Sequence, residues 1–262
     1  MDAIGPFAGR LDAELIRRYR DATNDRSAGV PPLAIVTQIW DAQEASRADL
    51  VPEVLQRAAG VHGEHDVVLH RPLAVGEPLR TWVTRHGVRP AGRNALVTLR
   101  YETRDADDAV VAEQWWTTAY LAASCDESGD RPPDHAFPAD ARDRPLGTYE
   151  VDVDAGMARR YAEASGDWSA HHFDLDAARR SGADRPFLHG LCTMALCARA
   201  IVQLVADGDA ARLRRAAVRF ASTMPLGETL VVRLYDAGDL GVAFEAHAKA
   251  SAVITHGRAE LH

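Results

Sequence analysis

A carboxylate and two histidines stand close together in the segment SGDWSAHHFD, which covers residues 165–174. Asp167 follows Gly166 directly and precedes His171 by four residues and His172 by five. A carboxylate and an imidazole can each take or give a proton near neutral pH, which is what adding or removing water requires. The segment therefore has two interpretations: an acid/base pair that holds a water molecule, or a turn followed by polar surface residues.

A binding site for a negatively charged oxygen is the second chemical feature, in the segment RPFLHG that ends at Gly190. A helix is expected after this segment, with Pro186 in its first turn. Backbone N–H groups at a helix start favour negative charge, and glycine lets a ligand approach its N–H closely. The Gly190 N–H is therefore suited to polarising a thioester carbonyl as an oxyanion develops. His189 beside it is either part of this site or a packed, hydrogen-bonded histidine.

Two stretches of the chain recur later in the same order. Residues 7–27 align with residues 149–169 without a gap, and the aligned positions share Arg-Arg-Tyr and an Asp followed two residues later by Ser. Residues 69–79 align with residues 220–230 through a shared Gly-Glu pair and a leucine. Repeated motifs in a constant order indicate two copies of one domain.

The two copies differ in the residues that could do chemistry. Asp25 of the first copy corresponds to Asp167, but Val30 stands where the second histidine would be, and Ala34-Ile35 replace the His-Gly pair. A loop with a purely structural purpose would not predict this difference. The asymmetry favours the acid/base interpretation and indicates an enzyme whose inert half became a binding half.

Each copy is expected to fold as a short helix, a loop, a longer apolar helix and then strands. Asp12 and Asp154 are expected to cap the short helices, and the longer helices are expected at 33–43 and 187–205. Alternating apolar and polar residues predict strands at 77–88, 94–105, 109–121, 216–222, 228–238, 242–250 and 251–261. This order is typical of an α+β fold with an antiparallel sheet wrapped around a long helix, and two such sheets could pair edge to edge.

The predicted domain boundaries follow from the repeat and from a change in composition. Residues 126–145 are rich in proline, aspartate and arginine and poor in apolar residues, which predicts a linker. The N-terminal copy then covers residues 1–125, and the C-terminal copy covers residues 146–262.

Composition and charge exclude several classes of protein. The chain has 262 residues, of which 47% are hydrophobic and 26% charged, as in globular proteins, and its formal net charge is -8. The negative charge argues against a nucleic-acid partner, and no apolar run is long enough to span a membrane. The three cysteines lack metal-ligand or disulfide spacing, so no metal is expected and a cytoplasmic location is favoured.

Around Asp167 the sequence resembles the MaoC-like dehydratases, in particular the two-domain (R)-specific enoyl-CoA hydratase 2 group. The shared motifs are Tyr161, the Ser-Gly-Asp that ends at Asp167, His172, and the Arg-Pro and His-Gly that lead to Gly190. The segments DRPFLHGLCTMAL, VRFASTMPLGETL and VHGEHDVVLHRPL also match the family, so the resemblance covers nearly the whole chain apart from the linker. The family's Asn-Pro is Ser169-Ala170 in this chain.

The resemblance implies a double hot-dog fold and a hydro-lyase that reversibly converts trans-2-enoyl-CoA to (R)-3-hydroxyacyl-CoA. It implies that Asp167 and His172 hold the catalytic water and that the Gly190 N–H polarises the thioester carbonyl. No cofactor is implied, and the acyl group would arrive as a thioester of coenzyme A or of an acyl carrier protein. A homodimer is a further expectation.

Further residues are expected to bind the substrate. The segment RLRRAAVRF (212–220) crosses into a strand beside the proposed site, and arginine can bind a coenzyme A phosphate through two N–H groups, although solvated strand-edge arginines are an equal alternative. A tryptophan of the inert half is expected to line the acyl path. The candidates for substrate binding are Ser169, His189, Arg215, Arg219, Trp40 and Trp82.

Three other functions remain open at this point. A hot-dog thioesterase would also use a carboxylate and an oxyanion-holding N–H but would not need the histidine at position 172. A non-catalytic subunit that binds acyl thioesters would tolerate the change to Ser169-Ala170. A dehydratase of carrier-bound fatty acyl or polyketide chains would use the same acid/base pair.

Overall fold

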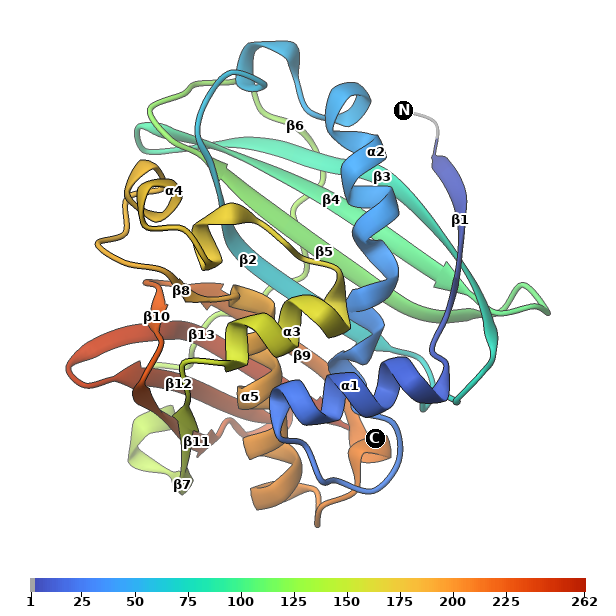
Figure 1. The fold of residues 1–262 in the computed structure, drawn as a ribbon, viewed down its shortest axis with the longest axis vertical. Helices are drawn as coiled ribbons and strands as arrows, with labels where there is room; N and C mark the ends of the chain where they lie inside the picture. The colour runs from blue at the N-terminus through green and yellow to red at the C-terminus, as the bar shows by residue number, and fades with distance from the viewer. Residues whose placement is uncertain (1–2) are drawn as a thin grey trace.

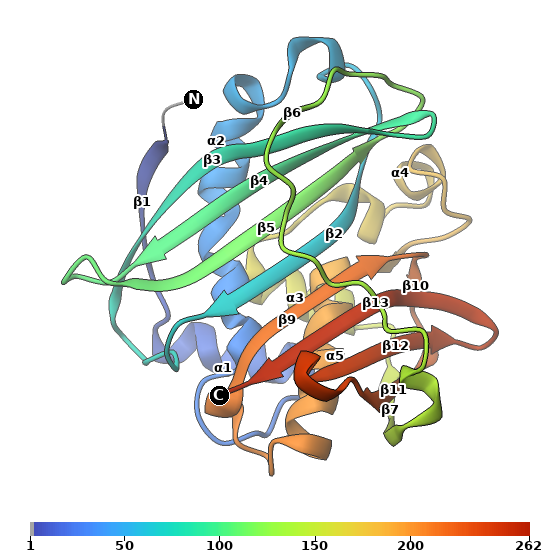
Figure 2. The same cartoon turned by 180° about the vertical axis from the view of Figure 1, so that it is seen from behind.

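The computed structural model describes residues 3–262, which form one large antiparallel sheet with the main helices on one face (Figure 1). Figure 2 shows the other face, which the extended segment between the two halves crosses. We refer to the helix side of the sheet as the inner face and to the opposite side as the outer face.

The N-terminal half supplies five strands of the main sheet. Its elements are β1 (Ile4–Arg10), α1 (Ala13–Thr23), the 3-10 helix η1 (Pro32–Ile39), α2 (Trp40–Leu50), η2 (Glu53–Leu55), β2 (Gly60–Leu69), β3 (Pro78–Ala91), β4 (Asn94–Arg104) and β5 (Val110–Tyr120). The connecting segment contains β6 (Ser128–Gly129) and η3 (Ala141–Asp143).

The C-terminal half supplies the other five strands and the longest helix. Its elements are β7 (Pro145–Val153), α3 (Met157–Ser165), η4 (Ala170–His172), α4 (Leu175–Arg180), β8 (Phe187–Leu188), α5 (Gly190–Val205), η5 (Ala210–Arg212), β9 (Leu213–Phe220), β10 (Met224–Pro225), β11 (Glu228–Asp236), η6 (Gly238–Leu240), β12 (Val242–Ala248) and β13 (Ser251–Leu261). Every strand predicted from the sequence is present.

The two halves have the same strand order. Along the sheet the strands run β1-β3-β4-β5-β2-β9-β13-β12-β11-β7. Counted outward from the centre, β2-β5-β4-β3-β1 corresponds element by element to β9-β13-β12-β11-β7. The duplication predicted from the sequence is therefore present in the fold.

The halves meet where β2 pairs with β9 in an antiparallel register that begins with Glu64 opposite Arg219. The pairing joins one edge strand of each half, so neither of these edges is exposed. On the inner face α1 packs against α3, and the matched tyrosines Tyr19 and Tyr161 lie with their ring centroids 5.9 Å apart. Both the sheet and the short helices therefore hold the two copies together.

The core lies between the inner face of the sheet and α5. All residues of α5 from Leu191 to Ala198 are buried, as expected for a helix that a sheet encloses. Cys192 and Cys197 of this helix are free and buried.

The prediction of one continuous helix over residues 33–43 is wrong. The chain makes a 3-10 helix, η1, and only then the α-helix α2, which begins at Trp40. Pro31 and Pro32 supply no backbone N–H, and the β-branched residues after them crowd the preceding turn of an α-helix. The N-terminal half therefore lacks a counterpart of the continuous helix α5.

Two predictions about helix starts also need correction. Asp12 caps α1 as predicted, but the N-cap of α3 is Gly156, and Asp154 accepts a hydrogen bond from the Gly156 N–H at 2.8 Å instead. Pro186 lies before α5 rather than in its first turn. The reason is that the next two residues pair with β10 as a small sheet, so the helix begins only at Gly190.

A buried ion pair crosses the junction on the outer face. The Arg215 guanidinium on β9 donates to both carboxylate oxygens of Asp66 on β2, at 2.7 and 3.1 Å, and to Glu260 at 2.9 Å. The connecting segment covers this pair, because the Asp134 carbonyl accepts from Arg215 at 3.0 Å. An ion pair as well as backbone hydrogen bonds therefore holds the two halves together at this junction.

Replacing Asp66 with alanine is expected to lower the free energy of unfolding by about 3 kcal/mol, because it breaks a buried pair from one side and leaves the Arg215 charge with fewer partners. Urea unfolding followed by circular dichroism measures the change. The control is Glu14→Ala, which breaks an exposed pair with Arg17 and should change stability little. Equal stabilities of the two variants would contradict this role of Asp66.

Candidate active site

The loop that follows α3 brings Asp167 and His172 together. The helix ends at Gly166, whose φ of 84° is in the left-handed region that glycine adopts without strain. The chain then turns through η4, which ends at His172. As a result Asp167 Oδ2 and His172 Nε2 lie 3.9 Å apart, with only 12% and 5% of the two side chains exposed.

Ser169 fixes the Asp167 carboxylate. Asp167 Oδ1 accepts from the Ser169 backbone N–H at 3.1 Å and from the Ser169 hydroxyl at 2.6 Å. The hydroxyl proton is therefore directed at Asp167, so Ser169 holds this carboxylate in place. Because Oδ1 is engaged twice, Oδ2 is the oxygen that faces His172.

The backbone determines which nitrogen of His172 carries the proton. Nδ1 lies 2.9 Å from the Phe187 carbonyl, and because a carbonyl can only accept, Nδ1 bears the hydrogen. Burial, with the neighbouring His189 and His171, lowers the pKa of His172 below its usual range, so the ring is neutral near pH 7. Nε2 therefore presents a lone pair toward Asp167 Oδ2.

The gap between these two atoms fits a water molecule. At 3.9 Å they are too far apart for a direct hydrogen bond, and a single water can bond to both. The His172 lone pair can accept a proton from that water, while the carboxylate holds its second hydrogen. The pair therefore has the geometry needed to activate water.

His189 contacts both members of the acid/base pair. Its Nε2 donates to the Asp167 backbone carbonyl at 3.0 Å, and its ring stacks on that of His172 with centroids 3.6 Å apart. The side chain is 1% exposed, and burial lowers its pKa, so it is neutral. His189 is therefore a positioning residue, which corrects its assignment to substrate binding.

Gly190 is the first residue of α5, and His189 is the N-cap. A Cβ atom at Gly190 would lie 3.2 Å from the ring of Phe220, so a larger residue would force that ring to move. The start of a 16-residue helix favours negative charge at its free N–H groups. Gly190 directly follows His189, whose ring stacks on that of His172, so this helix start adjoins a residue that contacts the acid/base pair.

The first copy preserves the loop without the chemistry. Asp25 Oδ1 accepts from the Ser27 N–H at 2.8 Å and from the Ser27 hydroxyl at 2.6 Å, which repeats the bonds between Asp167 and Ser169. Val30 stands in place of a histidine. The Asp-x-Ser turn is thus a structural feature of the duplicated unit, and the histidine is what distinguishes the C-terminal copy.

The structure does not bring Arg215 and Arg219 to this site. Alternation along β9 turns both to the outer face, where they pair with Asp66 and with Glu64, the latter at 2.8 Å. Phe220, the next residue, points to the inner side and contacts Gly190. The other two arginines of the segment also have carboxylate partners, in the pairs Arg212–Asp207 and Arg214–Glu260. The assignment of Arg215 and Arg219 to coenzyme A phosphates is therefore corrected.

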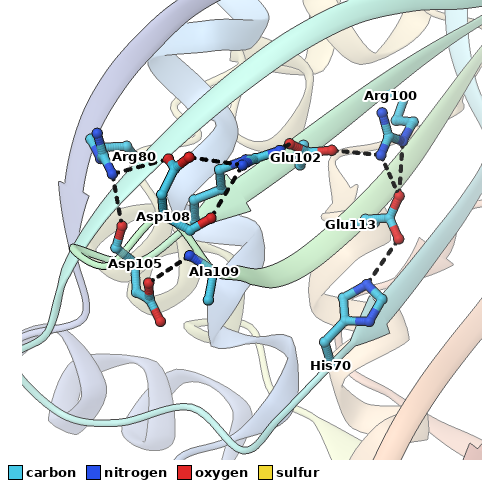
Figure 3. A network of polar contacts seen from close by, with 9 residues as sticks. His70, Arg80, Arg100, Glu102, Asp105, Asp108, Ala109 and Glu113 are labelled. Atoms are coloured by element: carbon cyan, nitrogen blue, oxygen red, sulfur yellow. Dashed lines mark hydrogen bonds and ion pairs between the residues drawn. The ribbon is translucent and has the colours of Figure 1, made fainter.

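Trp82 also lies on the outer face, so it does not line an inner acyl path. Its neighbours Thr81 and Val83 are buried on the inner side of β3, while the guanidinium groups of Arg80 and Arg104 lie 5.5 and 6.0 Å from its ring. Figure 3 shows the network of arginines and carboxylates to which Arg80 belongs.

Trp40 lies on the inner side and belongs to a row of rings that reaches Gly190. The rings of Trp40 and Trp116 are 5.7 Å apart, Trp116 stacks on His62 at 3.6 Å, and His62 lies 4.7 Å from Phe220. Phe220 in turn contacts Gly190. This aromatic row leads from the start of α5 into the N-terminal half.

Sequence reasoning did not single out His62, Trp116 and Phe220. The segment VHGEHDVVLHRPL was noted as a motif, but the register of β2 shifts between His62 and Glu64, so simple alternation does not predict the face to which His62 points. Contacts between the two halves then decide that His62 and Phe220 meet.

A metal ion is a competing occupant of the water position. Asp167, His172 and His189 each place a possible ligand atom within 4.8 Å of the others. These are ligand types that zinc accepts. Insensitivity of any activity to a chelator would distinguish water from metal at this position.

Known proteins share this fold. A solved MaoC-like dehydratase from Phytophthora capsici superimposes with a TM-score of 0.85 at 24% identity, covering 98% of this chain and 95% of that one. The fold is therefore the double hot-dog, as the sequence resemblance predicted. No helix within residues 3–262 is long and apolar enough to cross a membrane.

Sequence comparisons define the family. The family model described as "MaoC like domain" matches residues 138–257. The 3-hydroxyacyl-thioester dehydratase Y of Mycobacterium tuberculosis is 31% identical over 231 residues, which cover 87% of this chain and 77% of that protein. The peroxisomal multifunctional enzyme type 2 of Mus musculus is 26% identical over 263 residues, but the match spans only 35% of the mouse protein. The chain belongs to the MaoC-like dehydratase family.

His172 is expected to remain neutral, with its proton on Nδ1, as the pH falls through about 6.5, the usual imidazole pKa. Its pKa in the folded protein is lowered, so protonation should require more acid. NMR of the ring nitrogens, assigned by comparison with His172→Ala, measures this, and the signal should return to ordinary titration in urea. Protonation of folded His172 at or above about pH 6.5 would contradict the neutral state of the ring.

Proposed function

We propose that this protein reversibly hydrates trans-2-enoyl thioesters to (R)-3-hydroxyacyl thioesters. The observation that carries the proposal is the His172 Nε2 lone pair, 3.9 Å from Asp167 Oδ2 and beside the helix that begins at Gly190. A single water molecule can therefore bond both to the His172 Nε2 acceptor and to the Asp167 carboxylate. The family members named enoyl-CoA hydratase 2 and 3-hydroxyacyl-thioester dehydratase Y support the same reaction class.

The water molecule, the substrate and the side chains described above account for every bond and proton in the reaction. In the hydration direction the water oxygen bonds to C3 of the acyl group while His172 Nε2 takes one of its protons. The double-bond electrons move toward C2 and the thioester oxygen, whose negative charge the Gly190 N–H stabilises. A proton returned by the acid/base pair to C2 completes the addition. Dehydration is the same sequence reversed.

We assign the two halves to different tasks. The C-terminal half, residues 146–262, carries the acid/base pair and the oxyanion donor, and the N-terminal half, residues 1–125, shapes the acyl pocket. Residues 126–145 join them across the outer face. The aromatic row from Phe220 to Trp40 supports this division, because it extends from Gly190 into the N-terminal half.

The carrier of the acyl group is a thioester of coenzyme A or of an acyl carrier protein. The names of the relatives include both an enoyl-CoA hydratase and an acyl-thioester dehydratase. The cytoplasmic location and the homodimer remain predictions.

Crotonyl-CoA is expected to lose its conjugated enoyl absorbance when mixed with the protein, without release of free thiol, and the rate should not change on addition of a chelator. Ultraviolet absorbance and a thiol reagent measure the two outcomes together. Release of thiol would indicate a thioesterase and contradict the proposal. Absence of any change with this and longer enoyl-CoA substrates would favour a binding subunit.

Asp167→Asn and His172→Ala are each expected to lower kcat by at least about 10²-fold, because each removes a positioned acid/base group. The matched control for the first is Asp25→Asn, which alters the same turn in the inert copy, and the control for the second is the neighbouring substitution His171→Ala. Both controls should retain most of the activity. Wild-type-like rates in Asp167→Asn or His172→Ala would contradict the acid/base role of that residue.

A further inference from the structure

A second group of buried polar atoms lies on the inner face of the N-terminal half, away from the acid/base pair. Among residues 3–262, His65 Nδ1, His62 Nε2 and Trp40 Nε1 are shielded from solvent and have no hydrogen-bond partner in the protein. All three rings surround Trp116, with ring centroids 5.6, 3.6 and 5.7 Å from it. We call these three side chains the polar cluster.

The hydrogen bonds of Gln114 determine which ring nitrogen of His65 carries the hydrogen. The Gln114 amide nitrogen donates to the Ile35 carbonyl at 3.3 Å, so its oxygen must accept from His65 Nε2 at 3.2 Å. His65 Nε2 therefore carries the proton. Burial lowers the pKa of His65 to about 4, so the ring is neutral and Nδ1 is a hydrogen-bond acceptor.

The other members add a donor to the cluster. Trp40 Nε1 is an N–H group that can only donate. His62 contributes a ring nitrogen whose role depends on its tautomer, and burial also lowers its pKa well below the usual value. The polar cluster therefore presents at least one acceptor, at His65, and one donor, at Trp40.

Leaving these atoms without partners is costly. A buried donor or acceptor that finds no hydrogen bond costs about 1–3 kcal/mol, and folded proteins contain few of them. Nine such side-chain atoms occur within residues 3–262, and these three are grouped around a single ring, that of Trp116. By contrast, Arg100 of β4 and Glu113 of β5 on the outer face pair with each other (Figure 3).

The polar cluster continues the path from the active site. Phe220 contacts Gly190 and lies 4.7 Å from His62, and His62 lies 5.2 Å from His65. An acyl chain whose thioester oxygen binds the Gly190 N–H, and which runs toward the N-terminal half, would meet these nitrogens beyond its reacting carbons.

We propose that the polar cluster is a subsite for a hydroxyl group on the acyl chain, so that the substrates are oxygenated enoyl thioesters rather than plain fatty acyl ones. A hydroxyl both donates and accepts, so it can bond to the His65 acceptor or to the Trp40 donor. This inference rests on the proposed hydration and adds a substrate class to it. A site built to bond a hydroxyl discriminates strongly against the analogue that lacks it, because its own polar atoms stay unpaired.

The test compares trans-2-octenoyl-CoA with analogues that carry a hydroxyl at the terminal carbon or at a carbon nearer the thioester. The wild-type protein should favour one hydroxylated analogue by about tenfold or more in kcat/KM. Trp40→Phe, which removes the donor, and His65→Gln, which keeps an amide for Gln114 but removes the Nδ1 acceptor, should each abolish most of this preference. The preference is the ratio of kcat/KM for the hydroxylated analogue to kcat/KM for octenoyl-CoA, so a general loss of activity in a variant would leave it unchanged.

Trp115→Phe is the matched control. Trp115 lies on the same strand, β5, and its Nε1 is likewise buried without a partner among the described residues, but its ring packs against His86 rather than toward the polar cluster. This variant should keep the wild-type preference. Circular dichroism confirms that Trp40→Phe and His65→Gln are folded.

Two results would overturn the subsite. One is a wild-type protein that hydrates octenoyl-CoA better than every hydroxylated analogue. The other is an unchanged preference in both folded variants. If the wild type hydrates none of the thioesters, the proposed reaction fails, but calorimetric binding of the same substrates still tests the subsite. Equal affinities for the thioesters with and without the hydroxyl would reject the subsite. Tighter binding of a hydroxylated thioester that Trp40→Phe abolishes would support it.

Discussion

The antiparallel pairing of β2 with β9 is the constraint on which the rest of the molecule depends. It joins two five-stranded halves into one sheet and removes an exposed edge from each. The Arg215–Asp66 pair closes the junction on the outer face. On the inner face the same junction brings Phe220, at the end of β9, against His62 of β2, and so connects the helix start at Gly190 with the N-terminal half.

The duplicated unit separates structure from chemistry. The Asp-x-Ser turn has the same hydrogen bonds in both copies, at Asp25 and at Asp167, so these bonds serve the loop itself. What the C-terminal copy adds is His172, held by the Phe187 carbonyl, and His189, which stacks on it and bonds to the loop backbone. Both rings are kept neutral by burial. Two histidines thus distinguish the turn of the C-terminal copy from the same turn in the N-terminal copy.

Membership of the MaoC-like dehydratase family and the double hot-dog fold agree with this geometry. The inert half is nevertheless not a plain scaffold. Its long helix is replaced by η1 and α2, and Trp40 at the start of α2 lies over Trp116 on the inner face. A continuous apolar helix in that position would place different side chains there, so the broken helix accounts for the Trp40 nitrogen, while His62 and His65 come from β2.

The sequence by itself determined the duplication and the strands, and it pointed to Asp167 and His172 as a candidate acid/base pair, because these depend on local periodicity and on residues only five positions apart in one loop. It also pointed to Gly190 as a backbone donor near a helix start, although the helix begins three residues later than the sequence predicted, because residues 187–188 pair with β10. It could not assign Ser169, His189, Arg215, Arg219 and Trp82, because each depends on which partner or face the fold supplies. Arg215 and Arg219 point away from Gly190 through the alternation of β9, and a register shift in β2 sets the direction of His62. The tautomer of His172 follows from a carbonyl 15 residues away in sequence, which only the tertiary structure brings within hydrogen-bonding distance.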